Sequence, residues 1–200
     1  MEPLHPIEVR VLGSLLEKDL ATPEYYPLTL NALENACNQK SSREPIMSLD
    51  EAAVSQALET LRHRGLVSKV SGAGHRVEKY GHRLGESLNL GRRELALLCV
   101  LMLRGAQTVG ELRGRTERMH EFSDMEEVEH VLNILAAREP ALVAPAGRGR
   151  WVHTWHEHSE DSLVESIAPA ASNLAQRVEA LERELAELKQ QFESLRRQFE

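Results

Sequence analysis

The chain has only two cysteines among its 200 residues, and its longest uninterrupted apolar run, Leu95 to Leu103, covers nine residues. Two cysteines cannot form the framework of disulfides that holds small secreted domains together. A bilayer needs a run of about 20 apolar residues, so no segment predicts a membrane-spanning helix. Since the N-terminus also lacks a signal-peptide pattern, these absences favour a cytoplasmic protein.

The sequence also lacks the common motifs of catalysis. It contains no Walker-type phosphate loop, no Gly-x-Ser-x-Gly elbow and no Gly-x-Gly-x-x-Gly turn after a strand. Cys37 and Cys99 lie on apolar helical stripes, which indicates inert core residues and not nucleophiles. His153, His156 and His158 would need a bend to converge on one metal ion, and no second cluster has ligand spacing. We expect no enzymatic activity, no catalytic residues, no cofactor and no metal.

A basic excess, the usual sign of a polyanion-binding domain, is missing as well. The formal net charge is −7, of which residues 1–88 carry −2, residues 89–155 carry 0 and residues 156–200 carry −5. Most of the negative charge therefore lies toward the C-terminus. Charge by itself neither excludes nor indicates binding to nucleic acid.

What the sequence does contain is a pattern of three helices and a hairpin. Apolar residues recur at helical spacing in three stretches, and two β-prone runs then flank a glycine-rich loop. Ser48 followed by Glu51 predicts a capping box at the start of the third helix, and Gly65 predicts its end. The predicted elements are helices at 6–21, 28–37 and 48–64 and strands at 66–70 and 76–84.

The same order of elements occurs again after residue 89. The third helices align at an offset of 74 residues, which matches Val54, Leu58 and Leu61 with Val128, Leu132 and Leu135. Ser123 and Glu126 predict a second capping box. The second helices align at an offset of 79 residues. The matching residues there are Thr29, Leu30 and Leu33 with Thr108, Val109 and Leu112. Two copies of one module in tandem are the simplest interpretation.

Three helices and a hairpin in this order are typical of a winged helix. We predict a mainly α fold with small β-hairpins (α+β), built from tandem winged-helix domains and a C-terminal coiled-coil helix. The helix around Leu95–Leu103 is apolar on nearly every side, so we expect it to lie between the two modules or at a subunit contact. The predicted boundaries are 1–88 and 89–158 for the domains, 159–172 for a linker and 173–200 for the coiled coil.

Apolar residues near the C-terminus recur with the alternating spacing of a coiled-coil heptad. They are Leu174, Val178, Leu181, Leu185, Leu188, Phe192, Leu195 and Phe199. This stripe is narrower than a helix docked on a core needs, so it predicts a homodimer, and leucine at every d position favours parallel strands. The alternative is a single amphipathic helix docked on its own domain.

A winged helix ordinarily lays its third helix in the DNA major groove and sets its hairpin against the backbone or the minor groove. The segment 38–43 gathers amide, hydroxyl and cationic groups that can hydrogen-bond phosphate oxygens. Gln56 and Arg62 have the chemistry to contact adenine and guanine. The candidate nucleic-acid contacts are Asn38, Lys40, Ser41, Arg43, Gln56, Arg62, Arg76, Arg113 and Arg115.

These residues also have a structural interpretation. Asn38 can shape a long turn, and acidic residues on the third helix, such as Glu59, repel phosphates. Arg76 lies on a hairpin turn, where a lone arginine is commonly just solvated. Arg113 and Arg115 are interleaved with glutamates, which favours ion pairing on a solvated face.

Several blocks of the sequence, in the same order, are shared with a bacterial family. They are LLEK (15–18), YPLTLN (26–31), NACNQKS (35–41), REP (43–45), RVEKY (76–80), LRG (103–105), QT (107–108), GELR (110–113) and HEFSD (120–124). On these blocks, which span about Leu4 to Trp155, the chain resembles the YceH family. The resemblance implies a tandem winged-helix fold and a cytoplasmic bacterial protein. It implies no activity, because the family is functionally uncharacterised and offers no catalytic or ligand residues to transfer.

Two functions fit these observations. The first is a non-enzymatic DNA-binding dimer, with transcription regulation as one use, in which two arms contact two half-sites; the fold favours it. The second is a protein-interaction module that holds a partner chain, which the lack of positive net charge favours because a fold does not determine a function. Affinity for random duplex at low salt separates the two, since the phosphate contribution is strongest there.

Overall fold

The computed structural model describes residues 3–70 and 77–155. Met1–Glu157 forms one compact unit and His158–Glu200 forms a second. The predicted linker and coiled coil, including the heptad residues from Leu174 to Phe199, lie outside the described residues. The coiled coil, the homodimer and the domain boundaries therefore stay predictions.

The described part of the chain is mainly helical with small antiparallel sheets, which confirms the predicted fold class. The elements of its first half, up to residue 88, are α1 (Pro6–Ala21), η1 (Pro23–Tyr25), β1 (Leu28–Thr29), α2 (Leu30–Cys37), α3 (Glu51–His63), β2 (Val67–Val70), β3 (Lys79–His82) and α4 (Leu84–Leu88). Those of its second half are α5 (Arg92–Arg104), β4 (Gln107–Thr108), α6 (Val109–Thr116), α7 (Met125–Ala136), β5 (Val143–Pro145) and β6 (Arg150–His153).

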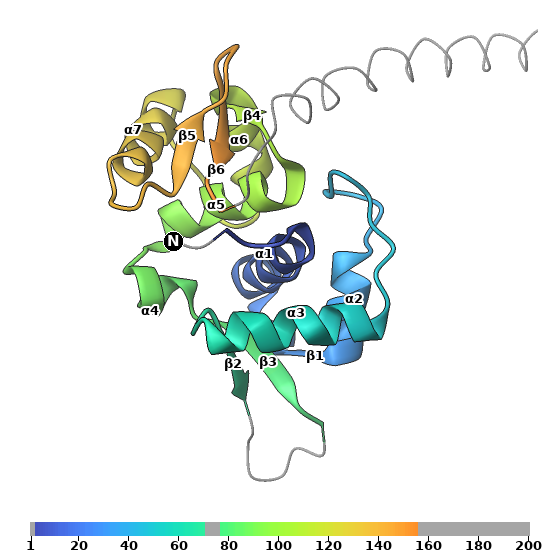
Figure 1. The fold of residues 1–200 in the computed structure, drawn as a ribbon. Coiled ribbons are helices and arrows are strands. Elements are labelled where there is room, and N and C mark those ends of the chain that lie inside the picture. The colour runs from blue at the N-terminus through green and yellow to red at the C-terminus, as the bar shows by residue number, and fades with distance from the viewer. Residues whose placement is uncertain (1–2, 71–76, 156–200) are drawn as a thin grey trace, which may run out of the picture. The chain divides into compact units, whose positions relative to one another are not determined.

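The two halves repeat one topology, as Figure 1 shows. Each holds a three-stranded antiparallel sheet with its last strand in the centre, in the orders β1-β3-β2 and β4-β6-β5. Thr29 caps α2 and Thr108 caps α6, each through a hydrogen bond that its side chain accepts from a backbone amide. These matches confirm the internal repeat. The two-residue strands β1 and β4 differ from the prediction, because so short a strand has no periodicity to detect.

The starts of the third helices correct the predicted capping boxes. Asp50 caps α3 and accepts a hydrogen bond from the Ala53 amide at 2.8 Å, so Ser48 lies outside the helix. Asp124 caps α7 and accepts from the Glu127 amide at 2.7 Å. An aspartate directly before the first helical residue reaches the free amide of the first turn and takes the place of the serine.

Helix α5 joins the two halves. All nine residues of the Leu95–Leu103 run are buried, and α1 packs along α5 (Figure 1). Gly13 of α1 makes this approach close, since a Cβ atom placed there would lie 3.0 Å from Cδ2 of Leu103 and 3.2 Å from Cβ of Met102. The thiol of Cys99 points at the Gly13 carbonyl oxygen at 3.6 Å. The expected position of this helix between the two modules is therefore confirmed.

The cysteines and the hydropathy of the helices agree with the sequence analysis. Cys37 and Cys99 are free and buried, and burial raises the pKa of both thiols. A thiol whose pKa is raised forms little of the reactive thiolate. Within residues 3–70 and 77–155, no helix has the length and hydropathy needed to span a bilayer.

Candidate functional site

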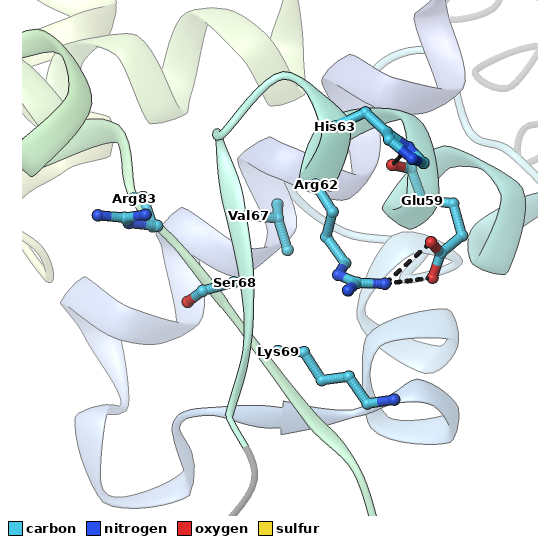
Figure 2. A pocket seen from close by; sticks show the side chains of 7 residues that line it. All are labelled: Glu59, Arg62, His63, Val67, Ser68, Lys69 and Arg83. Carbon is cyan, nitrogen blue, oxygen red and sulfur yellow. Dashed lines mark hydrogen bonds and ion pairs between the residues drawn. The ribbon is translucent and has the colours of Figure 1, made fainter.

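An open groove lies between the C-terminal part of α3 and the hairpin of β2 and β3 (Figure 2). Its volume is about 340 Å³. The residues that line it are Glu59, Arg62, His63, Val67, Ser68, Lys69 and Arg83. Figure 2 shows Arg62 and Lys69 on one side of β2, with Ser68 and Arg83 on the other. The groove therefore gathers cationic side chains from a helix and a strand.

The turn after α3 brings Arg62 and Lys69 together. Gly65 has φ +72° and its amide donates to the Arg62 carbonyl at 2.9 Å, so the chain leaves the helix through a left-handed residue. A residue other than glycine rarely adopts this conformation. Strand β2 follows at Val67, which is buried, and side-chain alternation places Lys69 on the same side of the strand as Val67.

Each cation of the groove has a carboxylate partner. Nη1 of Arg62 donates to both oxygens of Glu59, at 2.7 and 2.9 Å. Nζ of Lys69 pairs with Oε1 of Glu78 on the hairpin. On the other side of β2, Arg83 pairs with Glu86 at 3.1 Å.

The two pairs nearest α3 belong to one electrostatic network. The hydrogen bond from Lys69 lowers the pKa of Glu78, and the charge of Arg62 lowers it further. Tyr80, whose hydroxyl donates to Glu78 at 3.3 Å, has a raised pKa, first because of burial and then because of Glu78. Glu59 also raises the pKa of Tyr80, so the network extends from α3 across β2 to the hairpin.

Of the two residues predicted to contact bases, Gln56 lies on the exposed face of α3 and outside the groove, and Arg62 lines the groove. Gln56 is exposed, whereas Arg62 is half-buried and bound to Glu59. The first turn is acidic, with Asp50 as the cap and Glu51 next to it. Sequence reasoning missed Lys69 and Arg83, although the alternation of β2 after the glycine stop is a signal for Lys69.

The segment between α2 and α3 differs from the expected contact surface. Lys40 and Ser41 are exposed, as a phosphate contact requires. Asn38 is half-buried, and its side-chain amide donates to the Leu49 carbonyl at 2.7 Å and accepts from the Leu49 amide at 2.8 Å. Both ends of the Asn38 amide therefore hold the turn, which favours the structural interpretation, and its role as a DNA contact stays a prediction.

Arg43 lies away from the protein surface. Its side chain is fully buried and pairs with Glu17 of α1, with N–O distances of 3.0 and 2.6 Å. The guanidinium also donates to the Ala36 carbonyl and to the side-chain oxygen of Gln39. An arginine held in this way is not available to a phosphate. Its position fixes the 38–50 segment against α1 and α2.

The predicted arginines of the second half are engaged within the protein. Arg113 is exposed, but its guanidinium donates to the carbonyls of Phe122 and Ser123, at 3.3 and 3.0 Å, and so ties α6 to the loop before α7. Arg115 pairs with Glu111 at 3.5 Å. This agrees with the ion-pairing interpretation for Arg115.

The second half has no counterpart of the charged network. The helix caps align Asp50 with Asp124, and the strand registers align Lys69, opposite Tyr80, with Pro145, opposite Trp151. The counterparts of Glu59, Arg62, Lys69 and Glu78 are Asn133, Ala136, Pro145 and Gly149. Helix α7 contains three glutamates and neither lysine nor arginine. The groove chemistry therefore distinguishes the two halves.

Two other sets of sequence candidates are placed only in part. Arg76, His156 and His158 lie outside the described residues, so their roles stay predictions. His153 is buried in β6. Within the part of the chain that the structure describes, no group of three or more histidine, cysteine, aspartate or glutamate side chains is placed to hold a metal ion.

The sequence matches a described family along most of its length. The model for "Protein of unknown function, DUF480" matches residues 4–149. The chain belongs to this family. A UPF0502 protein of Solibacter usitatus is 50% identical over 98% of each chain, and one of Citrifermentans bemidjiense is 66% identical over 68% of this chain and 63% of its own length. A UPF0502 protein YceH of Salmonella paratyphi A is 48% identical over 94% of each chain, which confirms the resemblance to the YceH family.

Proposed function

We propose that the chain is a tandem winged-helix protein that binds duplex DNA through its first half and catalyses no reaction. In this proposal α3 enters the major groove and the β2–β3 hairpin lies against the backbone. The observation that carries it is the groove between these two elements, where Arg62, Lys69 and Arg83 are gathered. Gln56 and Arg62 have the hydrogen-bonding groups that contact adenine and guanine edges.

In this proposal the first half contacts the duplex and the second half does not. Helix α7 exposes Glu126 and Glu129, whose counterparts on α3 are the uncharged Ala52 and Ser55, and carboxylates there repel phosphates. Exposed Lys40 and Ser41, before α3, add hydrogen-bond donors to the first half. The second half then supports α1 through the α1–α5 packing and contributes no duplex contact.

The heptad pattern near the C-terminus extends the proposal to a homodimer. A parallel coiled coil joins the C-terminal ends of two chains and so supplies two copies of the first half. Two copies read two half-sites, and their spacing on DNA reflects the geometry of the dimer. Transcription regulation is one use of such a dimer.

A protein-interaction module is the second candidate function. The observation that favours it is the surface of α7, which carries neither lysine nor arginine and exposes Met125 and Ile134 beside its glutamates. Large apolar side chains on a surface are common at protein contacts, but single ones are also normal on monomers.

Fluorescence anisotropy of a labelled random duplex, measured at low and at moderate salt, tests the DNA proposal. We expect binding at low salt that weakens as salt rises, because phosphate contacts release counterions. Lys69→Ala and Arg62→Ala each weaken binding and reduce the salt slope by about one. Arg93→Ala is the matched control, since Arg93 is also a surface cation paired with a glutamate, Glu127, at 3.4 Å, but lies on α5.

Two results would contradict the proposal. One is undetectable binding of the wild-type protein at low salt, which would leave the protein-interaction candidate. The other is an equal loss of affinity in Arg93→Ala and Lys69→Ala, which would show that net charge matters and the groove does not.

A further inference from the structure

We propose that Glu59 and Glu78 are specificity-determining residues, which compete with DNA phosphates for Arg62 and Lys69 and so suppress binding to non-cognate duplex. The inference rests on the proposed DNA-binding function and deepens it. It assigns a role to the two acidic residues of a surface that is expected to approach a polyanion.

The geometry places these carboxylates directly on the cations of the groove. Both oxygens of Glu59 accept from the Arg62 guanidinium, at 2.7 and 2.9 Å, and Glu78 holds the Lys69 ammonium group. Side-chain exposures are 53% for Glu59 and 56% for Glu78, and 35% and 32% for their cationic partners. All four side chains therefore reach solvent. A ligand that approaches Arg62 or Lys69 meets a cation that is already paired with a carboxylate.

The internal repeat shows that the fold does not need this network. In the second half the same four positions hold Asn133, Ala136, Pro145 and Gly149, and the same helix, hairpin and sheet order form around them. Both cations and both carboxylates are absent there together. A set of charges that the fold does not require, on the surface that faces the proposed ligand, is better explained by binding than by packing.

Exchange of partners gives the mechanism of the competition. A phosphate that contacts Arg62 or Lys69 either shares the cation with a carboxylate or displaces it, and in both cases the carboxylate stays close enough to repel the phosphate. Exposed ion pairs are weak, so the exchange is feasible when base contacts add to it. A duplex that offers only phosphates gains little, whereas a sequence that also engages Gln56 or Arg62 gains base contacts. Specificity then comes from a penalty on the wrong ligand.

The test compares the double variant Glu59→Gln/Glu78→Gln with wild type, using anisotropy of a random duplex at several salt concentrations. Glutamine keeps the size of each side chain and removes its charge. We expect roughly tenfold tighter binding of random duplex at low salt, because Arg62 and Lys69 then contact phosphates without a competing carboxylate beside them. Circular dichroism verifies that the variant is folded.

The matched control is Glu127→Gln/Glu139→Gln. It changes the net charge equally and releases Arg93 from Glu127, but leaves the groove intact. We expect less than about a twofold change in affinity for the control, because distant surface charges are largely screened. An equal gain in the control would overturn the inference, since net charge alone would then explain the effect.

The outcomes separate this inference from the proposed function. If the wild-type protein binds duplex and Lys69→Ala weakens it, but the glutamine variant binds no better than wild type, the DNA function stands and the competition is wrong. If wild type, glutamine variant and control all fail to bind at low salt, both the function and the competition are wrong. If wild type binds random duplex and the glutamine variant, but not the control, binds it more tightly, both the function and the competition are confirmed.

Discussion

At the scale of single residues, two arginine–glutamate pairs of the same kind differ in burial. The Arg43 side chain is 0% exposed and that of Glu17 17%, whereas those of Arg62 and Glu59 are 35% and 53% exposed. Removing one member of a buried pair strands the other charge away from water, while an exposed partner is simply rehydrated. The buried pair supports the fold, and the exposed pair is free to exchange partners.

We predict that Arg43→Ala lowers the free energy of unfolding by about 3 kcal/mol or more, because Glu17 and the Ala36 carbonyl lose a buried donor. Arg62→Ala is the matched control and changes it by about 0.5 kcal/mol or less. Urea unfolding followed by circular dichroism measures both. Equal losses for the two variants would contradict the assignment of Arg43 to the structural network.

The same pair has a pH dependence of known sign. Burial by itself raises the pKa of Glu17, but the hydrogen bonds and charge of Arg43 outweigh it, so the pKa of Glu17 lies below its usual value. The pair therefore contributes stability above the pKa of Glu17 in the unfolded chain and loses it as the pH falls through the lower, folded value. In the same urea titrations, the difference between wild type and Arg43→Ala shrinks as the pH is lowered through this range.

At the scale of helices and strands, short-range hydrogen bonding decides where the elements begin. Asp50 and Asp124 cap corresponding helices, and serines at 48 and 123 had the expected capping-box spacing. Serine and aspartate are comparable caps, so the spacing to an acidic residue could not choose between them. In the folded protein the aspartate accepts the amide hydrogen bond of the first turn in both helices.

We predict that Asp50→Ala destabilises the protein by about 1 kcal/mol through the loss of the cap on the Ala53 amide. Ser48→Ala, two residues upstream, changes the stability by less than about 0.5 kcal/mol, as surface substitutions ordinarily do. Thermal unfolding of the two variants and wild type at one pH measures the difference. A larger loss for Ser48→Ala than for Asp50→Ala would restore the serine as the cap.

At the scale of the whole molecule, the packing of α1 on α5 makes one compact unit of the two halves, and the proposed dimer depends on residues beyond it. The Leu95–Leu103 run is buried within this unit, so its apolar surface is not available for a contact between subunits. Self-association is then expected to come from the heptad stripe.

We predict that deletion of residues 173–200 converts a dimer into a monomer without unfolding residues 1–157. Sedimentation equilibrium measures the mass, and circular dichroism follows the retained helices. Replacing Leu181 and Leu188 by lysine in the full chain is the control that keeps the length and disrupts only the d positions. An unchanged dimer mass in the deleted chain would assign self-association to the compact unit.

Features that depend on neighbours in the chain could be predicted from the order of the amino acids. Helical periodicity, the glycine stop at Gly65, the repeat offsets and the family each rest on local order, and the mainly α architecture follows from them. Short strands such as β1 could not be predicted, because two residues are too few to show a periodicity.

Which polar side chains are available to a ligand depends on contacts between residues far apart in the chain. Arg43 and Glu17 are 26 residues apart, and their burial depends on how α1 meets the 38–50 segment. Likewise, Lys69 joins Arg62 in a groove only because Gly65 turns the hairpin back along α3. A cation's availability is set by what surrounds it in three dimensions, because burial and the nearest carboxylate, and not the residue type, determine whether it is free to bind a phosphate.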